Sequence, residues 1–139
     1  KSNSSKDHLI YHLSKWIKDQ KVEIRSKVQN KGGTMRLGAY PAKIKKGTMA
    51  YSIYKKAIVS ERHRHRFEVN VDYQEALEDN GLTFSGFSQD GSLPEVVELP
   101  SHPFFLGVQF HPELKSKPFE PHPIFSAFVK KALEQTRLV

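Results

Sequence analysis

Hydrophobic positions recur along this chain with two different spacings. Between Leu9 and Ile17 apolar residues lie three and four positions apart, which predicts a helix. A short strand over 9–13 followed by a turn is the competing interpretation. Residues 21–28 alternate between apolar and charged side chains, as is typical of a half-exposed strand. The helical spacing returns over 124–138, where we expect an amphipathic helix to close the chain.

Between these segments the pattern mostly predicts strands separated by turns. The expected strands cover 34–44 (interrupted at Gly38 and Pro41), 57–59, 82–88, 93–99 and 104–110. The expected turns cover 30–33, 89–92 and 100–103, and the expected short helices cover 48–54 and 72–80, the latter with Asp72 as N-cap. Early strands, a central hairpin and a closing helix indicate an α/β fold, with a mixed sheet and flanking helices.

Composition narrows the class of protein only slightly. The chain has 139 residues and 37% hydrophobic residues, which suits one domain or part of one. Its net charge of +7 raises the possibility of a nucleic-acid partner, but the lysines are scattered and are not interleaved with aromatic residues. No apolar stretch approaches the roughly 20 residues that span a bilayer, and we expect no secretory signal because the first residues are polar and lack an apolar run. We therefore expect neither nucleic acid nor membrane as a partner, and take the cytoplasm as the default location.

The tripeptide His111-Pro112-Glu113 carries the clearest chemistry. It follows the apolar run 104–110, which predicts a buried strand, and residues two apart on a strand point to the same face. A carboxylate beside an imidazole fixes its tautomer and supports its charged form, which is how a general base is oriented. A histidine near a strand end with an unrelated surface acid is the alternative interpretation. A nucleophile is missing from the pair, and the sequence contains no cysteine.

The run Arg62-His63-Arg64-His65-Arg66 alternates two kinds of basic residue. On a strand, the arginines share one face and the histidines share the other. An arginine can recognise a carboxylate through its planar donors, but for Arg62 and Arg64 we favour structural pairing with Glu61, Glu68 and other acids. The two histidines have no third ligand at a suggestive spacing, so no metal site is expected. The glycines of 32–38 match no phosphate-binding loop, and we expect a tight turn and close backbone approach at Gly38.

Three segments together carry a resemblance to a known family. They read Gly-Gly-Thr-Met-Arg-Leu-Gly at 32–38, Glu-Arg-His-Arg-His-Arg-Phe-Glu-Val-Asn at 61–70, and His-Pro-Phe-Phe at 102–105 leading to Gln-Phe-His-Pro-Glu at 109–113. In this order they resemble the C-terminal half of the glutaminase domain of CTP synthases, a class I glutamine amidotransferase domain of flavodoxin-like fold. The resemblance runs from about Leu9 to the closing helix.

The resemblance implies a definite activity. Enzymes of this family make CTP from UTP with ATP, Mg²⁺ and ammonia taken from glutamine, and they are cytoplasmic tetramers when complete. A synthetase domain uses the ATP and Mg²⁺, so no cofactor is implied for this chain. The glutaminase domain uses a Cys-His-Glu triad. By position, His111 is implied as the base, Glu113 as its orienting acid, and Arg66 as the residue that holds glutamine.

Two departures from the family pattern shape the expectations. The family's nucleophilic cysteine lies upstream of the matched region, so we expect residues 1–139 to be the C-terminal portion of the domain, truncated upstream of that cysteine and inactive alone. Asn3-Ser4-Ser5 is not followed by the family's glutamate. Either that acid is lost or residues are missing between Ser5 and Asp7, and we favour missing residues. The alternatives are a cysteine-less, amidotransferase-like interaction module and a basic nucleic-acid-binding domain.

Overall fold

The computed structural model describes residues 9–12, 15–18, 21–24 and 35–137. Strand β1 (Ile10–His12) pairs antiparallel with β6 (Phe67–Val69), and β2 (Lys15–Lys18) pairs antiparallel with β3 (Lys21–Ile24). The helix predicted over 9–17 is therefore wrong, and the competing strand is nearer to the structure. Pairing with a strand more than fifty residues away has overridden the local spacing, as tertiary context often does. The turn predicted at 30–33 and the proposed gap between Ser5 and Asp7 lie outside the described residues.

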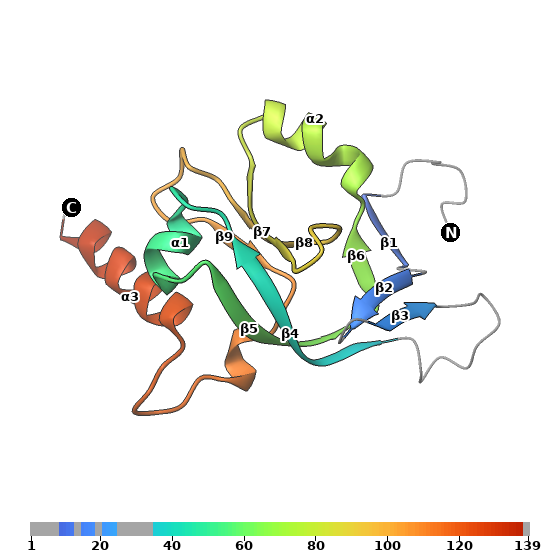
Figure 1. Ribbon diagram of the computed structural model, residues 1–139. Helices are drawn as coiled ribbons and strands as arrows, with labels where there is room; N and C mark the ends of the chain where they lie inside the picture. The colour runs from blue at the N-terminus through green and yellow to red at the C-terminus, as the bar shows by residue number, and fades with distance from the viewer. Residues whose placement is uncertain (1–8, 13–14, 19–20, 25–34, 138–139) are drawn as a thin grey trace, which may run out of the picture.

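The main sheet has five strands in the order β5-β4-β7-β8-β9. Their bounds are β4 Arg36–Ile44, β5 Ile58–His65, β7 Thr83–Ser88, β8 Pro94–Glu98 and β9 Leu106–Val108. The α/β class with flanking helices is confirmed, and the hairpin of β7 and β8 lies where it was predicted (Figure 1). All ladders among the described residues are antiparallel, so they contain no parallel pair of the kind that a mixed sheet requires.

Strand β4 continues through both positions where an interruption was expected. Gly38 has φ +96°, a conformation that side-chain-bearing residues rarely adopt, but a Cβ there would meet nothing within 4 Å. Conformation, and not close approach, therefore accounts for this glycine. Pro41 is tolerated because the ladder to β7 begins only at Ala42, one residue further on. The Lys45 N–H points toward β7, and the backbone nitrogens of alternate residues point to the same side of a strand. The nitrogen of Pro41 therefore also faces that side, at a position where β7 is not yet paired, so the missing N–H costs no ladder hydrogen bond.

Within the part of the chain that the structure describes, three helices flank the strands. Helix α1 (Met49–Tyr54) begins at the predicted place, with Thr48 as N-cap. Helix α2 (Gln74–Asp79) follows a 3-10 turn, and the cap predicted at Asp72 is wrong: Asn70 caps the turn by accepting the Asp72 N–H. The side-chain oxygen of Asn70 lies before the first residue of the turn, where a capping acceptor must be. Asp72 lies inside the turn, so its own side chain cannot cap the start.

The C-terminal helix α3 (Pro123–Thr136) packs beside α1 at the end of the molecule opposite β1 (Figure 1). Ile124, at the start of the helix that was expected to be amphipathic, is buried, whereas Phe128, Val129 and Leu133 are exposed. None of the described helices is long and apolar enough to cross a membrane.

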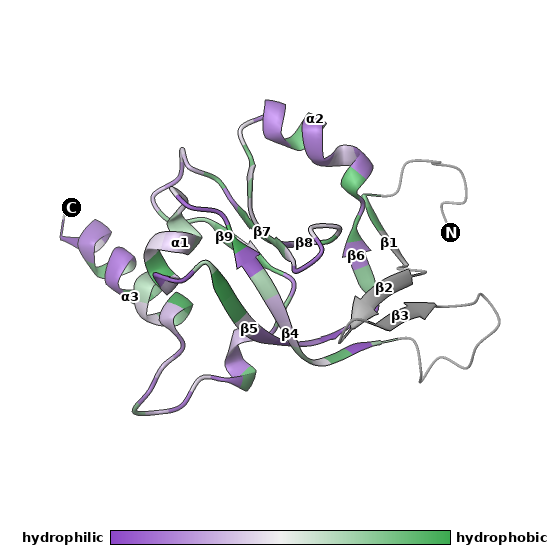
Figure 2. Ribbon diagram, in the orientation of Figure 1, coloured by the Kyte–Doolittle hydropathy of each residue, from purple (hydrophilic) through white to green (hydrophobic). Residues whose placement is uncertain are grey.

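The main hydrophobic core lies between the sheet, α1 and the start of α3. Figure 2 shows the change along β5, where hydrophobic colouring at Ile58–Val59 gives way to hydrophilic colouring over the basic run. The core cluster consists of Ala42, Ile44, Ala50, Val59, Val96, Phe110 and Ile124. Phe110 is 3% exposed and directly precedes His111. Burying a phenylalanine contributes about 1.5–3 kcal/mol, so the backbone leading into His111 is firmly anchored.

Candidate active site

The structure brings His111 and Glu113 together as predicted, but by a different route. Strand β9 is shorter than the predicted strand over 104–110 and ends at Val108, and Phe105 is exposed, so that prediction is wrong in length and in burial. Pro112 instead begins a 3-10 turn, Pro112–Leu114, with His111 at its N-cap. Proline suits the first position of a helical turn because its φ is preset and its missing N–H is not required there. The turn folds Glu113 back toward His111.

A hydrogen bond joins the two side chains. His111 Nδ1 lies 2.7 Å from Glu113 Oε1, and the side chains are 36% and 56% exposed. The pKa of Glu113 is lowered, first by its own backbone N–H and then by His111, with a further contribution from the Arg64 charge. The carboxylate is therefore charged and places the imidazole proton on Nδ1, which leaves Nε2 as the nitrogen that can accept a proton. This is the arrangement of a general base accessible to a reactant.

Strand β5 supports the turn that carries the candidate base and acid (His111 with Pro112–Leu114, called the catalytic turn below). His111 N–H donates to the Arg62 carbonyl at 2.8 Å, so the turn is attached to the basic run. Arg66 lies half-buried between β5 and β6, four residues further along the chain. At about 3.3 Å per residue, its Cα is at most about 13 Å from that of Arg62. The structure thus places Arg66 on the segment that supports His111, and its role in holding glutamine stays a prediction.

Within β5, which ends at His65, the faces of the basic run are arranged as predicted. Arg62 and Arg64 are exposed, and His63 is buried on the other face of β5. The predicted pairing of these arginines with Glu61 and Glu68 is wrong, because both acids are buried while the two arginines point outward. Both acids have other partners: Lys115 and His122 for Glu61, Arg36 and His65 for Glu68.

A buried charge cluster that was not predicted from the sequence lies beneath the basic run. Arg36, 2% exposed, donates to Glu95 at 2.7 Å and to Glu68 at 3.2 Å. Next to it, His63 Nδ1 lies 2.8 Å from His65 Nε2. Burial raises the pKa of Glu95 to about 7, although the Arg36 charge opposes that rise. Burial, then Arg36, lowers the pKa of His63 to about 2, which makes His63 a neutral structural residue.

Another carboxylate that sequence reasoning missed is Glu98, in β8. It accepts the backbone N–H groups of Met49 and Ala50, at 2.9 and 3.1 Å, and so satisfies the start of α1. The one available signal was a second glutamate in an otherwise apolar strand. Among the described residues, no group of three or more His, Cys, Asp or Glu side chains could hold a metal ion.

Comparison with known proteins agrees with this geometry. The family model described as glutamine amidotransferase class-I matches residues 12–131, and the chain belongs to this family. Within it, the similar proteins are CTP synthases: the one from Brucella anthropi is 54% identical over 135 residues, and the one from Maricaulis maris is 58% identical over 133. These alignments cover 97% and 96% of this chain but 25% and 24% of the relatives. The chain thus spans about a quarter of their length.

A solved structure shows the same likeness. The glutaminase domain of Trypanosoma brucei CTPS, with bound acivicin, superposes with a TM-score of 0.70 at 43% identity. The match covers 76% of this chain and 43% of that one. The resemblance to the glutaminase domain of CTP synthases is therefore confirmed, and with it the amidotransferase fold.

Proposed function

We propose that this chain is the glutaminase portion of a CTP synthase and supplies the base and the orienting acid for glutamine hydrolysis. The observation that carries the proposal is the 2.7 Å hydrogen bond between His111 Nδ1 and Glu113 Oε1. It lies on a chain whose similar proteins are named CTP synthase.

In this proposal His111 moves protons at three points of the reaction. Through Nε2 it takes the proton of a cysteine thiol, protonates the departing ammonia, and then activates the water that hydrolyses the thioester. Glu113 holds the ring in the required tautomer and stabilises its charged form. Arg66 pairs with the α-carboxylate of glutamine, for which the planar guanidinium is suited. The cysteine is not among the 139 residues, so another part of the complete enzyme supplies it.

The remaining roles belong to the complete enzyme. A synthetase domain would use ATP and Mg²⁺ to activate UTP and would receive the ammonia released here. We keep the tetrameric assembly and the cytoplasmic location as parts of the same proposal. They rest on the resemblance, because this chain spans about a quarter of the relatives.

The test is a His111→Ala substitution in the complete enzyme. We expect CTP formation from glutamine to be abolished and CTP formation from added ammonia to persist, because only the first needs the imidazole. Initial rates with each nitrogen source provide the measurement. Loss of both activities would contradict the assignment of His111 to glutamine hydrolysis.

The lack of cysteine is the specific observation that favours a second candidate. A cysteine-less, amidotransferase-like module would bind a partner without hydrolysing glutamine. Glutamate release by the wild-type complete protein separates the two, since such a module would release none.

A further inference from the structure

Glu61 is a buried carboxylate on which several elements converge beneath the catalytic turn. It is 1% exposed, and its Oε1 lies 3.0 Å from both the Tyr54 hydroxyl, which donates to it, and His122 Nε2. Since His122 Nδ1 accepts the Ile124 N–H, the ring proton sits on Nε2 and points at Glu61. The other oxygen, Oε2, lies 3.5 Å from Lys115 Nζ.

The charge on Glu61 is maintained in spite of burial. Burial alone would raise the pKa of the Glu61 carboxyl, but the His122 hydrogen bond, the nearby charges and the Tyr54 hydroxyl outweigh it, and the pKa is lowered. The acid therefore remains an anion that attracts Lys115. The pKa of Tyr54 is raised, first by burial and then by Glu61, so the hydroxyl keeps the proton that it donates.

The catalytic turn is fixed to β5 at two points, and Glu61 lies between them. At one end, His111 N–H donates to the Arg62 carbonyl at 2.8 Å. At the other, Lys115 Nζ donates to the Ser60 carbonyl at 2.5 Å while facing Glu61. Loss of the Glu61 charge would loosen Lys115, and with it the end of the turn that carries Glu113.

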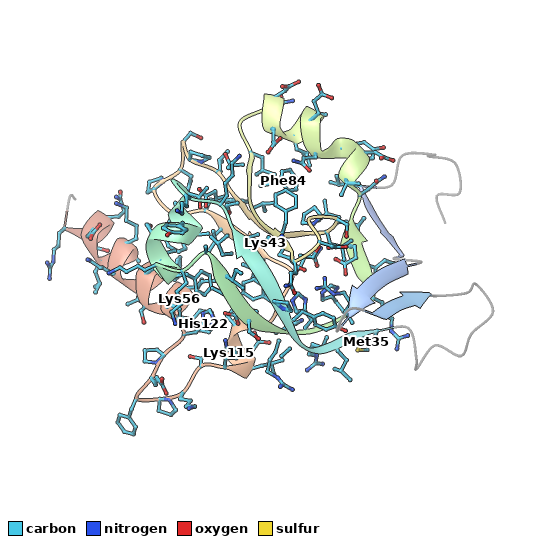
Figure 3. The ribbon with its side chains drawn as sticks, viewed as in Figure 1. Met35, Lys43, Lys56, Phe84, Lys115 and His122 are labelled. Atoms are coloured by element: carbon cyan, nitrogen blue, oxygen red, sulfur yellow. The ribbon has the colours of Figure 1, made fainter. Side chains whose placement is uncertain are left out.

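The turn borders a hollow on the side of Lys115. The hollow has a volume of about 680 Å³ and is lined by Glu61, Lys115 and His122 among others, and Figure 3 shows Lys56, His122 and Lys115 near one another there. Lys115 itself is 41% exposed. On this side the turn is therefore held through the polar contacts of Lys115 with Glu61 and the Ser60 carbonyl, in addition to the apolar anchor at Phe110.

We propose that Glu61 is a positioning residue for the His111–Glu113 pair, acting through Lys115 and His122. This inference rests on the proposed function. In this proposal Glu61 does not contact the reactant. It fixes the position of the turn relative to β5, and thereby the orientation of the His111 ring. A general base displaced by about 1 Å can lose about 100-fold in rate, so small shifts of the turn matter.

The experiment compares Glu61→Gln with wild type in the complete enzyme. We expect the kcat for glutamine hydrolysis to fall about 10- to 100-fold, with the KM for glutamine nearly unchanged and ammonia-dependent CTP formation intact. Glu120→Gln is the matched control, because this exposed acid lines the same hollow and pairs with Lys117, and it should leave all three quantities unchanged.

Two variants of the exposed Lys115 keep the test informative if Glu61→Gln fails to fold. Lys115→Met should lower kcat in the same selective way, and Lys115→Arg, which keeps the charge, should restore most of it. An unchanged kcat in Lys115→Met, or an equal loss of ammonia-dependent activity, would overturn the inference. Failure of the proposed function is distinguishable, since then wild type would not release glutamate from glutamine.

Discussion

The hydrogen bond between His111 and Glu113 permits a quantitative prediction for Glu113→Gln. Glutamine is nearly isosteric and can still accept from His111 Nδ1, but it carries no charge. The substitution therefore removes the charge assistance and keeps the contact. We expect the complete enzyme to retain glutamine binding and to lose part of its rate of glutamine hydrolysis.

The size of the loss follows from the geometry. Loss of the whole charge-assisted hydrogen bond in the transition state would cost roughly 10- to 150-fold in rate, and Glu113→Gln, which keeps the contact, should cost no more than that. In serine-protease triads, where the acid is buried, neutralising it lowers the rate about 10⁴-fold. Glu113 is 56% exposed, so water screens its charge and the smaller range applies.

The assay is the initial rate of CTP formation with glutamine and, separately, with ammonia. The ammonia-dependent rate should not change, and Glu113→Ala should lose more than Glu113→Gln because the ring loses its orienting contact as well. A loss above about 10³-fold for Glu113→Gln would exceed what one exposed charge-assisted hydrogen bond supplies. That result would refute the view of Glu113 as a solvent-screened orienting acid.

Two further predictions concern Arg66, the residue proposed to bind glutamine, and the buried charge cluster around Arg36 and Glu95. Arg66→Met should raise the KM for glutamine about 10- to 100-fold, as expected for a lost charge-assisted pair, and leave ammonia-dependent CTP formation unchanged. A lower kcat with an unchanged KM would contradict the role of Arg66 in binding glutamine. Burial raises the pKa of Glu95 from 4.5 to about 7. Between these two pH values the folded protein keeps a proton that the unfolded chain releases. The free energy of unfolding should therefore be highest below pH 4.5 and decline by about 3 kcal/mol as the pH rises to 7. Urea unfolding at several pH values should show this decline in wild type relative to Glu95→Gln, and parallel curves would count against it.

Much of the fold follows from local pattern in the sequence. Alternation identified β3, and the turn residues 89–92 marked the hairpin of β7 and β8. The strand predicted over 57–59 is too short, because β5 runs from Ile58 to His65. Thr48 marked the start of α1. These features depend on neighbours a few residues away, which is the range that periodicity and capping describe. The helix predicted over 9–17 was wrong because β1 is held by β6, a partner that local spacing does not reveal.

The candidate site divides in the same way. His111 and Glu113 are two residues apart, so their pairing could be predicted even though the expected strand was replaced by a 3-10 turn. The supporting contacts could not be predicted. Arg36 reaches Glu95, 59 residues away, and His122 reaches Glu61, 61 residues away. No propensity or spacing connects charges at such separations; only the folded sheet does.

Buried acids on β5, β6 and β8 explain why such distant contacts matter for the site. Glu61, Glu68, Glu95 and Glu98 lie where an antiparallel sheet would ordinarily carry apolar side chains, and each is at most 3% exposed. Such groups add little net stability, because desolvation offsets most of their attraction, but removing one partner leaves a charge buried without compensation. Each buried acid therefore raises the free energy of any arrangement in which its own partner is displaced. Glu61 directly precedes Arg62, whose carbonyl accepts the His111 N–H. The free-energy cost of displacing the partners of Glu61 therefore favours one alignment of the catalytic turn with the basic run.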